Sequence, residues 1–485
     1  MRRLGIFILP LLLAGGASGP SAGPVPAPSE IARSTGGGSD ALSRAASLLI
    51  GEEMVSGGAY RKLAWLTDRI GSRLSGSPGA AAAVAWAQEE FRRDGMSRVR
   101  AEKVMVPHWV RGVEAAAILA PVSQPMAVTA IGMSVPTPAE GVSSEVVEVA
   151  SFDELHALGG KARGKIVLYN VPILPNPDGD GYGGAAGLRY RGAVEAAKQG
   201  AVAMLIRSLG TLSARLPHTG SHAYEDGVER IPAAALAAED ADLLHRLLAS
   251  GSPVRVRLTL GCQILPDVES ANVMAELRGT VLPDEIVLIG GHLDSWDLGT
   301  GAIDDGAGVA ISMEALRLLK SLQLRPRRTI RAVLFMNEEN GSRGGKAYAA
   351  DHEKELEKHV AAIESDSGAG RPLGFSVNAG KGGDAVIREL ASRLRSLGAT
   401  DVQSGGHGGV DISSMLGAGV PLLGLRQDMT LYFDWHHTAG DTLDKVDPRE
   451  LADNAAAMAF LAYALAEQEV PLPRIPPESR KDASH

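Results

Sequence analysis

The sequence of 485 residues contains almost no cysteine, since Cys262 is the single one. An intramolecular disulfide is therefore excluded, and the fold has to be stabilised by packing. Cys262 stands in the segment LGCQI without a nearby histidine, so a thiol nucleophile activated by an imidazole is not indicated. A chain of this length has ample apolar residues to bury and predicts two or three structural units.

An excess of positive charge is also absent. The formal net charge is -9, with 48 Lys and Arg residues against 57 Asp and Glu residues. No basic stripe and no polybasic patch is present, so neither a nucleic acid nor a membrane surface is indicated as a partner. An acidic, soluble protein is therefore the default expectation.

The N-terminus carries a short apolar run. The segment MRRLGIFILPLLLAGGASG has two arginines, an apolar stretch interrupted by Pro10, and small residues at its end. This pattern is typical of a signal peptide, which we assign to residues 1–22, and it predicts a secreted or periplasmic protein. The run is short for a membrane span, and no cysteine follows it, which argues against a lipoprotein. An uncleaved interfacial anchor is the alternative.

Composition and periodicity divide the remaining chain into units. A stretch rich in Pro, Gly and Ser follows the leader and predicts a disordered linker. Helical patterns then run from Asp40 to about Val106, and a later region of short β-rich runs, helices and glycine-rich loops indicates a compact α/β insert. The predicted units are a linker (23–39), a main domain (40–125 and 263–470), an insert (126–262) and a flexible tail (471–485).

From Ala271 onward strand and helix alternate as in a doubly wound α/β fold. EIVLIGG (285–291) is a continuous apolar run, as expected of a strand buried on both faces. RTIRAVLF (328–335) and HVAAIE (359–364) are two further strands, with helical patterns between the three. The sequence therefore predicts a doubly wound, mostly parallel sheet for the main domain.

Polar side chains follow each of these strands. His292 and Asp294 come directly after the first strand, Glu338 and Glu339 after the second, and Asp366 after the third. In open α/β sheets, ligands bind beyond the carboxyl ends of parallel strands. We therefore expect these side chains to meet in one crevice.

Two later loops add donors to that crevice. Asp304 precedes a glycine-rich helix start, and the segment DWHHTAGDT supplies His437. Imidazole and carboxylate together suit zinc and related metals, and one carboxylate can bridge two ions roughly 3.5–4 Å apart. We predict that Asp304 bridges two Zn²⁺ ions, with Mn²⁺ or Co²⁺ as possible replacements. The remaining predicted ligands are His292 and Asp366 on one ion and Glu339 and His437 on the other.

Glu338 and Glu339 are given different roles. Adjacent residues of an extended segment point to opposite sides, so both bind one ion only if the chain turns sharply. We predict Glu339 as a ligand and Glu338 as the general base that takes a proton from water. Asp294 follows His292 by two residues and is predicted to hold the imidazole in its metal-binding tautomer, without binding metal itself.

These residues resemble the M28 metallopeptidases, a family with co-catalytic zinc pairs. The resemblance rests on the segments HLD, DDGAG, NEEN, ESDSG and HTAGDT, and it implies the ligands and the base already named. It extends over roughly Asp40 to Glu467 and implies that the insert is a protease-associated domain. One branch of the family is closest, which implies an exopeptidase acting on dipeptides or short peptides with free termini, and possibly a homodimer.

Some features depart from the pattern or leave alternatives open. Asn337 stands where many family members have alanine, and His436 competes with His437 for the metal. His218 and His222, in PHTGSHAY, lack a carboxylate cluster and are interpreted as loop or interface residues. The alternative functions are an aminopeptidase acting on longer peptides, a single-zinc glutaminyl cyclase, and a receptor-like homologue without activity.

Overall fold

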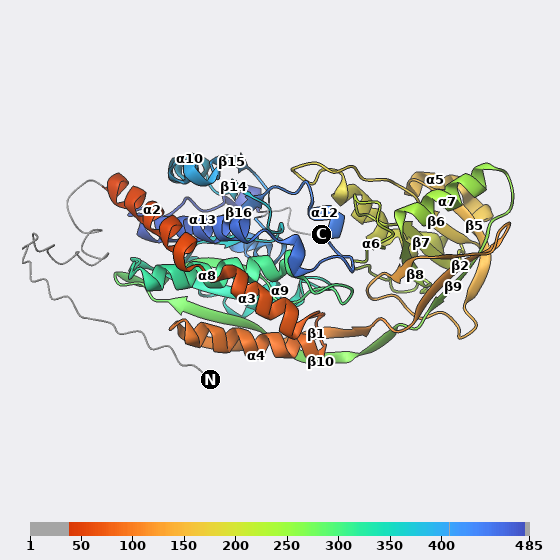
Figure 1. Cartoon of the computed structure of the whole chain (residues 1–485), viewed down its shortest axis with the longest axis horizontal. Helices are drawn as coiled ribbons and strands as arrows, with labels where there is room; N and C mark the ends of the chain where they lie inside the picture. The colour runs from red at the N-terminus through yellow and green to blue at the C-terminus, as the bar shows by residue number, and fades with distance from the viewer. Residues whose placement is uncertain (1–37, 407, 481–485) are drawn as a thin grey trace, which may run out of the picture.

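The computed structural model describes residues 38–406 and 408–480. Two units, each built on its own sheet, lie side by side along the long axis of the molecule (Figure 1). The predicted signal peptide and residues 23–37 of the predicted linker lie outside the described residues. No helix of the described part of the chain is long and apolar enough to cross a membrane.

The larger unit contains a mixed eight-stranded sheet with the order β1-β10-β12-β11-β13-β16-β14-β15. Its central strands β12, β11, β13 and β16 run parallel, whereas β1, β10 and β14 run antiparallel to their neighbours toward the centre of the sheet. The strands are β1 (Ser97–Val110), β10 (Gln263–Leu277), β11 (Leu282–His292), β12 (Arg328–Phe335), β13 (His359–Glu364), β14 (Pro372–Asn378), β15 (Asp401–Ser404) and β16 (Leu422–Gln427).

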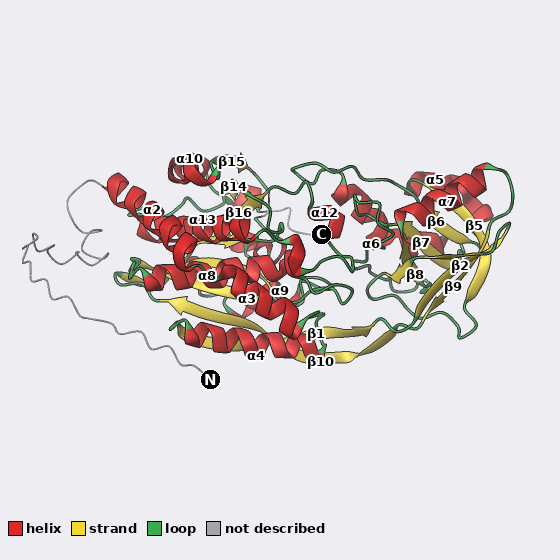
Figure 2. Ribbon diagram, in the orientation of Figure 1, coloured by secondary structure: helices red, strands yellow, loops and turns green. Residues whose placement is uncertain are grey.

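Helices cover both faces of this sheet (Figure 2). Val287 and Ile289 of β11 join the core under one group of helices, while Ile286 and Leu288 join a second core on the opposite face. This alternation explains why β11 reads as a continuous apolar run. The first face carries α2 (Gly38–Ser56), α3 (Ala59–Trp65), α4 (Pro78–Arg93), α8 (Ala307–Ser321), α10 (Gly383–Ala391) and α13 (Pro448–Glu467); the second carries α9 (Arg343–Asp351) and α11 (Val410–Ser413).

The smaller unit forms the predicted α/β insert. Its eight-stranded sheet has the order β3-β2-β9-β5-β6-β7-β8-β4 and packs two apolar clusters, one on each face. Its elements are β2 (Glu114–Ala120), β3 (Gln124–Met126), β4 (Val128–Ala130), β5 (Val142–Val149), α5 (Phe152–Leu158), β6 (Ile166–Tyr169), α6 (Tyr182–Lys198), β7 (Ala203–Arg207), β8 (Ala233–Leu236), α7 (Ala238–Ala249) and β9 (Arg255–Leu260).

Two boundaries differ from the expectation. The sheet of the insert already begins at Glu114, ahead of the predicted boundary at residue 126, because β2 pairs with β9. The helical pattern expected up to about Val106 ends at Arg93, and β1 begins at Ser97. The long antiparallel pair β1 and β10 leads into and out of the insert. A strand forms here because β10 offers pairing partners that the local helical signal does not reveal.

The predicted flexible tail needs a similar correction. Ile475 is fully buried, and the Arg474 guanidinium donates hydrogen bonds to the carbonyl oxygens of Leu356 at 3.1 Å and Ala418 at 2.8 Å. Residues 471–480 therefore pack on the main domain, because a buried isoleucine and a multiply bonded arginine hold them there. Residues 481–485 lie outside the described part of the chain.

Candidate metal centre

The carboxyl ends of the central strands lie level with one another and bring the predicted donors together. His292 ends β11 and is in register with Phe335, the last residue of β12, while Gly290 is in register with Glu364, the last residue of β13. The loops after β12 and β13 begin here, so Glu338 and Asp366 follow at the same edge.

A first group of metal-binding atoms surrounds His292. Its Nε2 atom lies 3.1 Å from Asp304 Oδ1 and 3.4 Å from Asp366 Oδ1. The three side chains offer ligand atoms within 4.8 Å of one another. Imidazole and two carboxylates at this spacing are a donor set that fits a divalent cation.

A second group shares Asp304. His437 Nε2 lies 3.0 Å from Asp304 Oδ2 and 3.0 Å from Glu339 Oε2, and these three residues again have ligand atoms within 4.8 Å of one another. Asp304 therefore turns one carboxylate oxygen to each group. The five residues that the sequence predicts as ligands lie in two groups of three with Asp304 in common.

In the part of the chain that the structure describes, two buried carboxylate oxygens at the centre lack hydrogen-bond donors, which is the environment that a cation would satisfy. Asp304 Oδ2 and Glu339 Oε2 each lie 3.0 Å from His437 Nε2, yet within the described residues neither oxygen accepts a hydrogen bond. Burial and the charge of Asp304 raise the pKa of Glu339 well above its ordinary value. Unpaired buried carboxylate oxygens are costly, and cations between them would remove that cost.

Glu338 lies on the other side of the chain from Glu339. Its Oε2 atom is 4.0 Å from His292 Nε2, so Glu338 faces the first group while Glu339 faces the second. Asn337 precedes the pair with a φ of 73°, a left-handed conformation that asparagine adopts more readily than most residues. Glu338 and Asp366 each keep 17% side-chain exposure, which marks the side of the centre that is open to solvent.

Asp294 supports this arrangement in a way that differs from the expected one. The Nδ1 atom of His292 lies 3.0 Å from the main-chain oxygen of Asp294 and 3.8 Å from its carboxylate. The carboxylate instead accepts hydrogen bonds from the main-chain amides of Asn337 at 2.7 Å and Glu338 at 3.1 Å. The main chain of Asp294 thus orients the imidazole, and its carboxylate holds the turn that carries Glu338.

Asp441 and Arg73 hold the loop that carries Asp304. Asp441 Oδ1 accepts from the amides of Ala302 and Ile303, both at 2.8 Å. Arg73 is fully buried and donates to the carbonyl oxygens of the same loop, at 2.9 Å to Gly301. Asp441 belongs to the HTAGDT segment, which is a sequence signal for it. Arg73 lies more than two hundred residues away in the chain and has no such signal.

The other two aspartates of the HLDSWDLGTGAIDDGAG segment have structural partners. Asp305 accepts from the amides of His292 at 3.0 Å and Gly308 at 2.9 Å. Asp297 forms a two-pronged ion pair with the buried Arg111, at 3.0 and 2.9 Å from Nε. Arg111 precedes β2, so Asp297 ties the metal-centre loop to the start of the insert.

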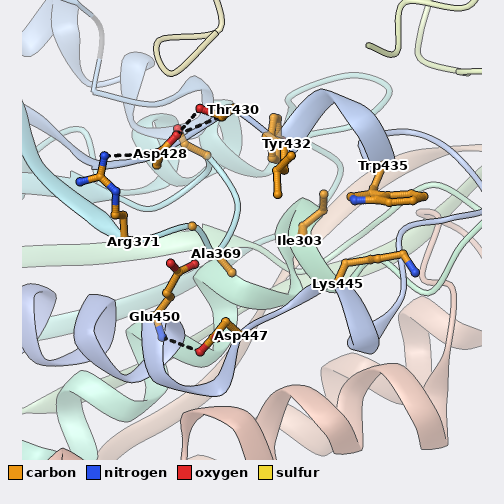
Figure 3. A pocket seen from close by; sticks show the side chains of 13 residues that line it. Ile303, Ala369, Arg371, Asp428, Thr430, Tyr432, Trp435, Lys445, Asp447 and Glu450 are labelled. Carbon is orange, nitrogen blue, oxygen red and sulfur yellow. Dashed lines mark hydrogen bonds and ion pairs between the residues drawn. The ribbon is translucent and has the colours of Figure 1, made fainter. Parts of the chain in front are cut away.

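A cavity of about 470 Å³ opens next to the centre (Figure 3). Its lining includes Ile303 and Ser367, the chain neighbours of Asp304 and Asp366. Tyr432 and Trp435 of α12 (Tyr432–Trp435) line it together with charged side chains. The cavity is large enough for a small ligand. The remaining lining residues are Ala369, Gly370, Arg371, Asp428, Thr430, Leu431, Lys445, Asp447 and Glu450.

Comparison with known proteins gives a consistent result. The sequence model of peptidase family M28 matches residues 272–462. Carboxypeptidase Q from Homo sapiens is 42% identical over 416 residues, covering 86% of this chain and 87% of that protein. The crystal structure of a peptidase M28 precursor from Shewanella amazonensis superposes with a TM-score of 0.88 at 44% identity, over 90% of this chain and 100% of that one.

A more distant structure shares the fold. A zinc aminopeptidase from Bacillus subtilis has a TM-score of 0.62 at 20% identity and covers 88% of this chain and 98% of that one. This likeness shows that the two chains share a fold.

Proposed function

Because the chain belongs to peptidase family M28 and is a metallopeptidase, we propose that it is an exopeptidase with two zinc ions at the shared Asp304. The single observation that carries the proposal is that Asp304 directs one oxygen to each of two groups of donor atoms. A carboxylate that bridges two metal ions would use its two oxygens in this way.

The proposed ligands follow from this geometry. His292 and Asp366 would hold one ion together with Asp304, and Glu339 and His437 would hold the other together with the same aspartate. Mixed imidazole and carboxylate donors suit Zn²⁺, and they also accept Mn²⁺ or Co²⁺. The buried oxygens of Asp304 and Glu339 that accept no hydrogen bond within the described residues support the presence of cations.

The side chains of this chain have defined tasks in hydrolysis. When bound, the zinc pair polarises the scissile carbonyl and lowers the pKa of water. Glu338, with its carboxylate on the open side of the centre, takes a proton from the attacking water and passes it to the leaving amine. Asp294 keeps Glu338 in place through two main-chain amides, which positions the carboxylate before substrate arrives.

The proposed substrates are dipeptides or short peptides with free termini. The support is the 42% identity to carboxypeptidase Q over most of both chains, together with the cavity beside Asp304 and Asp366. This cavity has room for one side chain or one short peptide. Secretion or export to the periplasm is proposed from the leader sequence, and a homodimer from the likeness to this branch. The insert is proposed to be a protease-associated domain.

The test is a substrate panel run together with metal analysis on the mature chain. Free dipeptides are compared with versions blocked at the N-terminus or at the C-terminus, and bound zinc is counted for each preparation. Hydrolysis of free dipeptides at two zinc ions per chain is the expected result. Turnover of long peptides with a free amino terminus identifies an aminopeptidase instead. One zinc ion with pyroglutamate formation, or no hydrolysis after zinc is added, contradicts the proposal.

A further inference from the structure

His218 belongs to the insert and reaches the metal centre of the other unit. Its side chain is fully buried, and its Nε2 atom lies 3.0 Å from Nδ1 of His436 in a hydrogen bond. Within the described chain, Nδ1 of His218 has no hydrogen-bond partner. The neighbouring Thr219 donates its amide to the main-chain oxygen of His437 at 2.9 Å. The insert therefore contacts both histidines of the pair through adjacent residues.

His436 and His437 present the same kind of atom to Asp304. Their rings are stacked with centroids 3.6 Å apart, and their Nε2 atoms lie 3.2 Å and 3.0 Å from Asp304 Oδ2. Only His437 belongs to the group of ligand atoms that Asp304 and Glu339 form within the described residues. Both rings nevertheless reach Asp304, and the positions of their protons decide which ring presents a bare nitrogen there.

The hydrogen bond from His218 supplies this distinction. A neutral imidazole has one nitrogen that donates and one that accepts. If His436 donated from Nδ1, its bare Nε2 would face a carboxylate oxygen, and His218 would hold its own proton on Nδ1, where no partner exists. If His218 donates from Nε2, its Nδ1 is a bare acceptor instead of an unpaired buried N–H group. His436 then carries its proton on Nε2 and turns it toward Asp304.

We propose that His218 is a positioning residue that holds His436 in the tautomer with the proton on Nε2. A protonated ring nitrogen cannot bind a metal, so His437 alone supplies the imidazole ligand on this side, and the N–H group of His436 faces the bridging carboxylate. The inference rests on the proposed function, because it assumes zinc at Asp304. It makes the insert part of the metal centre through His218.

A metal held by the three histidines themselves is the competing interpretation. His218, His436 and His437 do have nitrogen atoms within 4.8 Å of one another. However, the Nε2 atom of His437 already faces Asp304 and Glu339, and the trio contains no carboxylate to offset the charge of a further ion. A hydrogen bond between two neutral rings needs no such compensation.

The test combines zinc binding with histidine NMR on the whole chain. Zinc affinity is measured by competition with a chelator for wild type, His218→Ala, His218→Gln and His359→Gln. The last is a buried-histidine control, since His359 is bonded to Tyr348 at 2.8 Å outside the centre. The ring nitrogens are observed in ¹⁵N-histidine-labelled protein, with His436→Gln to assign the signal of His436.

The expected result is that His218→Ala binds the second zinc ion about 10- to 100-fold more weakly, as is usual when the polar support of a ligating carboxylate is lost, here the N–H group that His436 turns toward Asp304. His359→Gln should match wild type. In wild type the NMR signals should show a proton on Nε2 of His436, and in His218→Ala a mixture of tautomers. His218→Gln should recover part of the affinity, because its amide can donate to His436.

Three outcomes overturn the inference. The first is that NMR of zinc-bound wild type shows no proton on Nε2 of His436. This measurement needs no variant, so it remains decisive if His218→Ala fails to fold. The second is that folded His218→Ala binds zinc with the affinity of wild type. The third is that wild type binds a third zinc ion and His218→Ala does not. Wild type that binds no zinc at all overturns the proposed function first, which separates that failure from the other three.

Discussion

The main-chain amide of Trp296 donates a hydrogen bond of 3.0 Å to Glu339 Oε1. The indole of the same residue is buried in the apolar cluster of the insert. One residue therefore packs into the smaller unit and holds a carboxylate of the metal centre in the larger one. Trp296 therefore links the packing of the insert to the position of Glu339.

Gly132 offers the sharpest test of this coupling. A Cβ atom at this position would lie 1.9 Å from the Trp296 ring, so Gly132→Ala should push the indole and its amide away from Glu339. We expect kcat/KM to fall by about 10²-fold, the order that a shift of about 1 Å costs at a catalytic group. Steady-state kinetics on a free dipeptide measures this effect.

Gly184→Ala is the matched control for that substitution. Gly184 lies in α6 of the same insert, and a Cβ there meets no atom within 4 Å. The control should keep wild-type kinetics. Wild-type activity in Gly132→Ala would show that Trp296 does not transmit the position of the insert to Glu339.

Glu338 and Asp304 should respond differently to substitution. Glu338→Gln retains the shape of the side chain and removes the base, so kcat should fall by about 10²- to 10⁴-fold while the zinc content stays at the wild-type value. Asp304→Ala removes both oxygens that face the two groups, so zinc should be lost. Metal analysis and kinetics of the two variants check this. A near-wild-type kcat in Glu338→Gln would exclude Glu338 as the base.

Asp441→Ala should loosen the loop that carries Asp304. The substitution leaves the buried amides of Ala302 and Ile303 without an acceptor, which costs about 1–3 kcal/mol for each group that water cannot reach. We expect a lower free energy of unfolding and weaker zinc binding, measured by denaturant titration with and without zinc. Asp351→Ala, at an exposed position at the end of α9, should change neither quantity.

His352, which lies outside the metal centre, should make the free energy of unfolding depend on pH. Burial lowers its pKa, but hydrogen bonds to Glu102 and Glu355, both 2.9 Å long, outweigh this and raise the pKa to about 9. The unfolded value is near 6.5. A histidine whose pKa is raised by folding stabilises the folded state fully when the pH is below its pKa in the unfolded state. This contribution is lost as the pH rises through its pKa in the folded state.

The difference in unfolding free energy between wild type and His352→Gln should therefore depend on pH. We expect on the order of 2 kcal/mol at about pH 6, the range for hydrogen bonds to charged groups, and a much smaller difference above about pH 9.5. Denaturant titrations across this range measure it. A difference that stays constant with pH would mean that the charged form of His352 does not stabilise the fold.

Local patterns predicted most of the central architecture. The apolar runs at 285–291, 328–335 and 359–364 correspond to β11, β12 and β13, and the helical pattern after Asp305 corresponds to α8. The expectation failed at Ser97–Val110, where a helical pattern was extended into β1. Burial along β1 is irregular, and the strand is formed by its pairing with β10, more than 150 residues away in the sequence.

The sequence by itself determined which donors stand at the strand ends, because a buried strand and the polar residues after it are neighbours in the chain. His292, Glu338, Glu339 and Asp366 were predicted in this way, and Asp304 and His437 were predicted from two later loops. Tertiary structure alone decided how these donors are supported: it set the Asp294 carboxylate on the turn of Glu338, Trp296 between insert and Glu339, and His218 against His436. Such contacts join residues 43 to 218 positions apart. The pairing of β11 with β12 and the packing of the two units bring these residues together, which no local periodicity encodes.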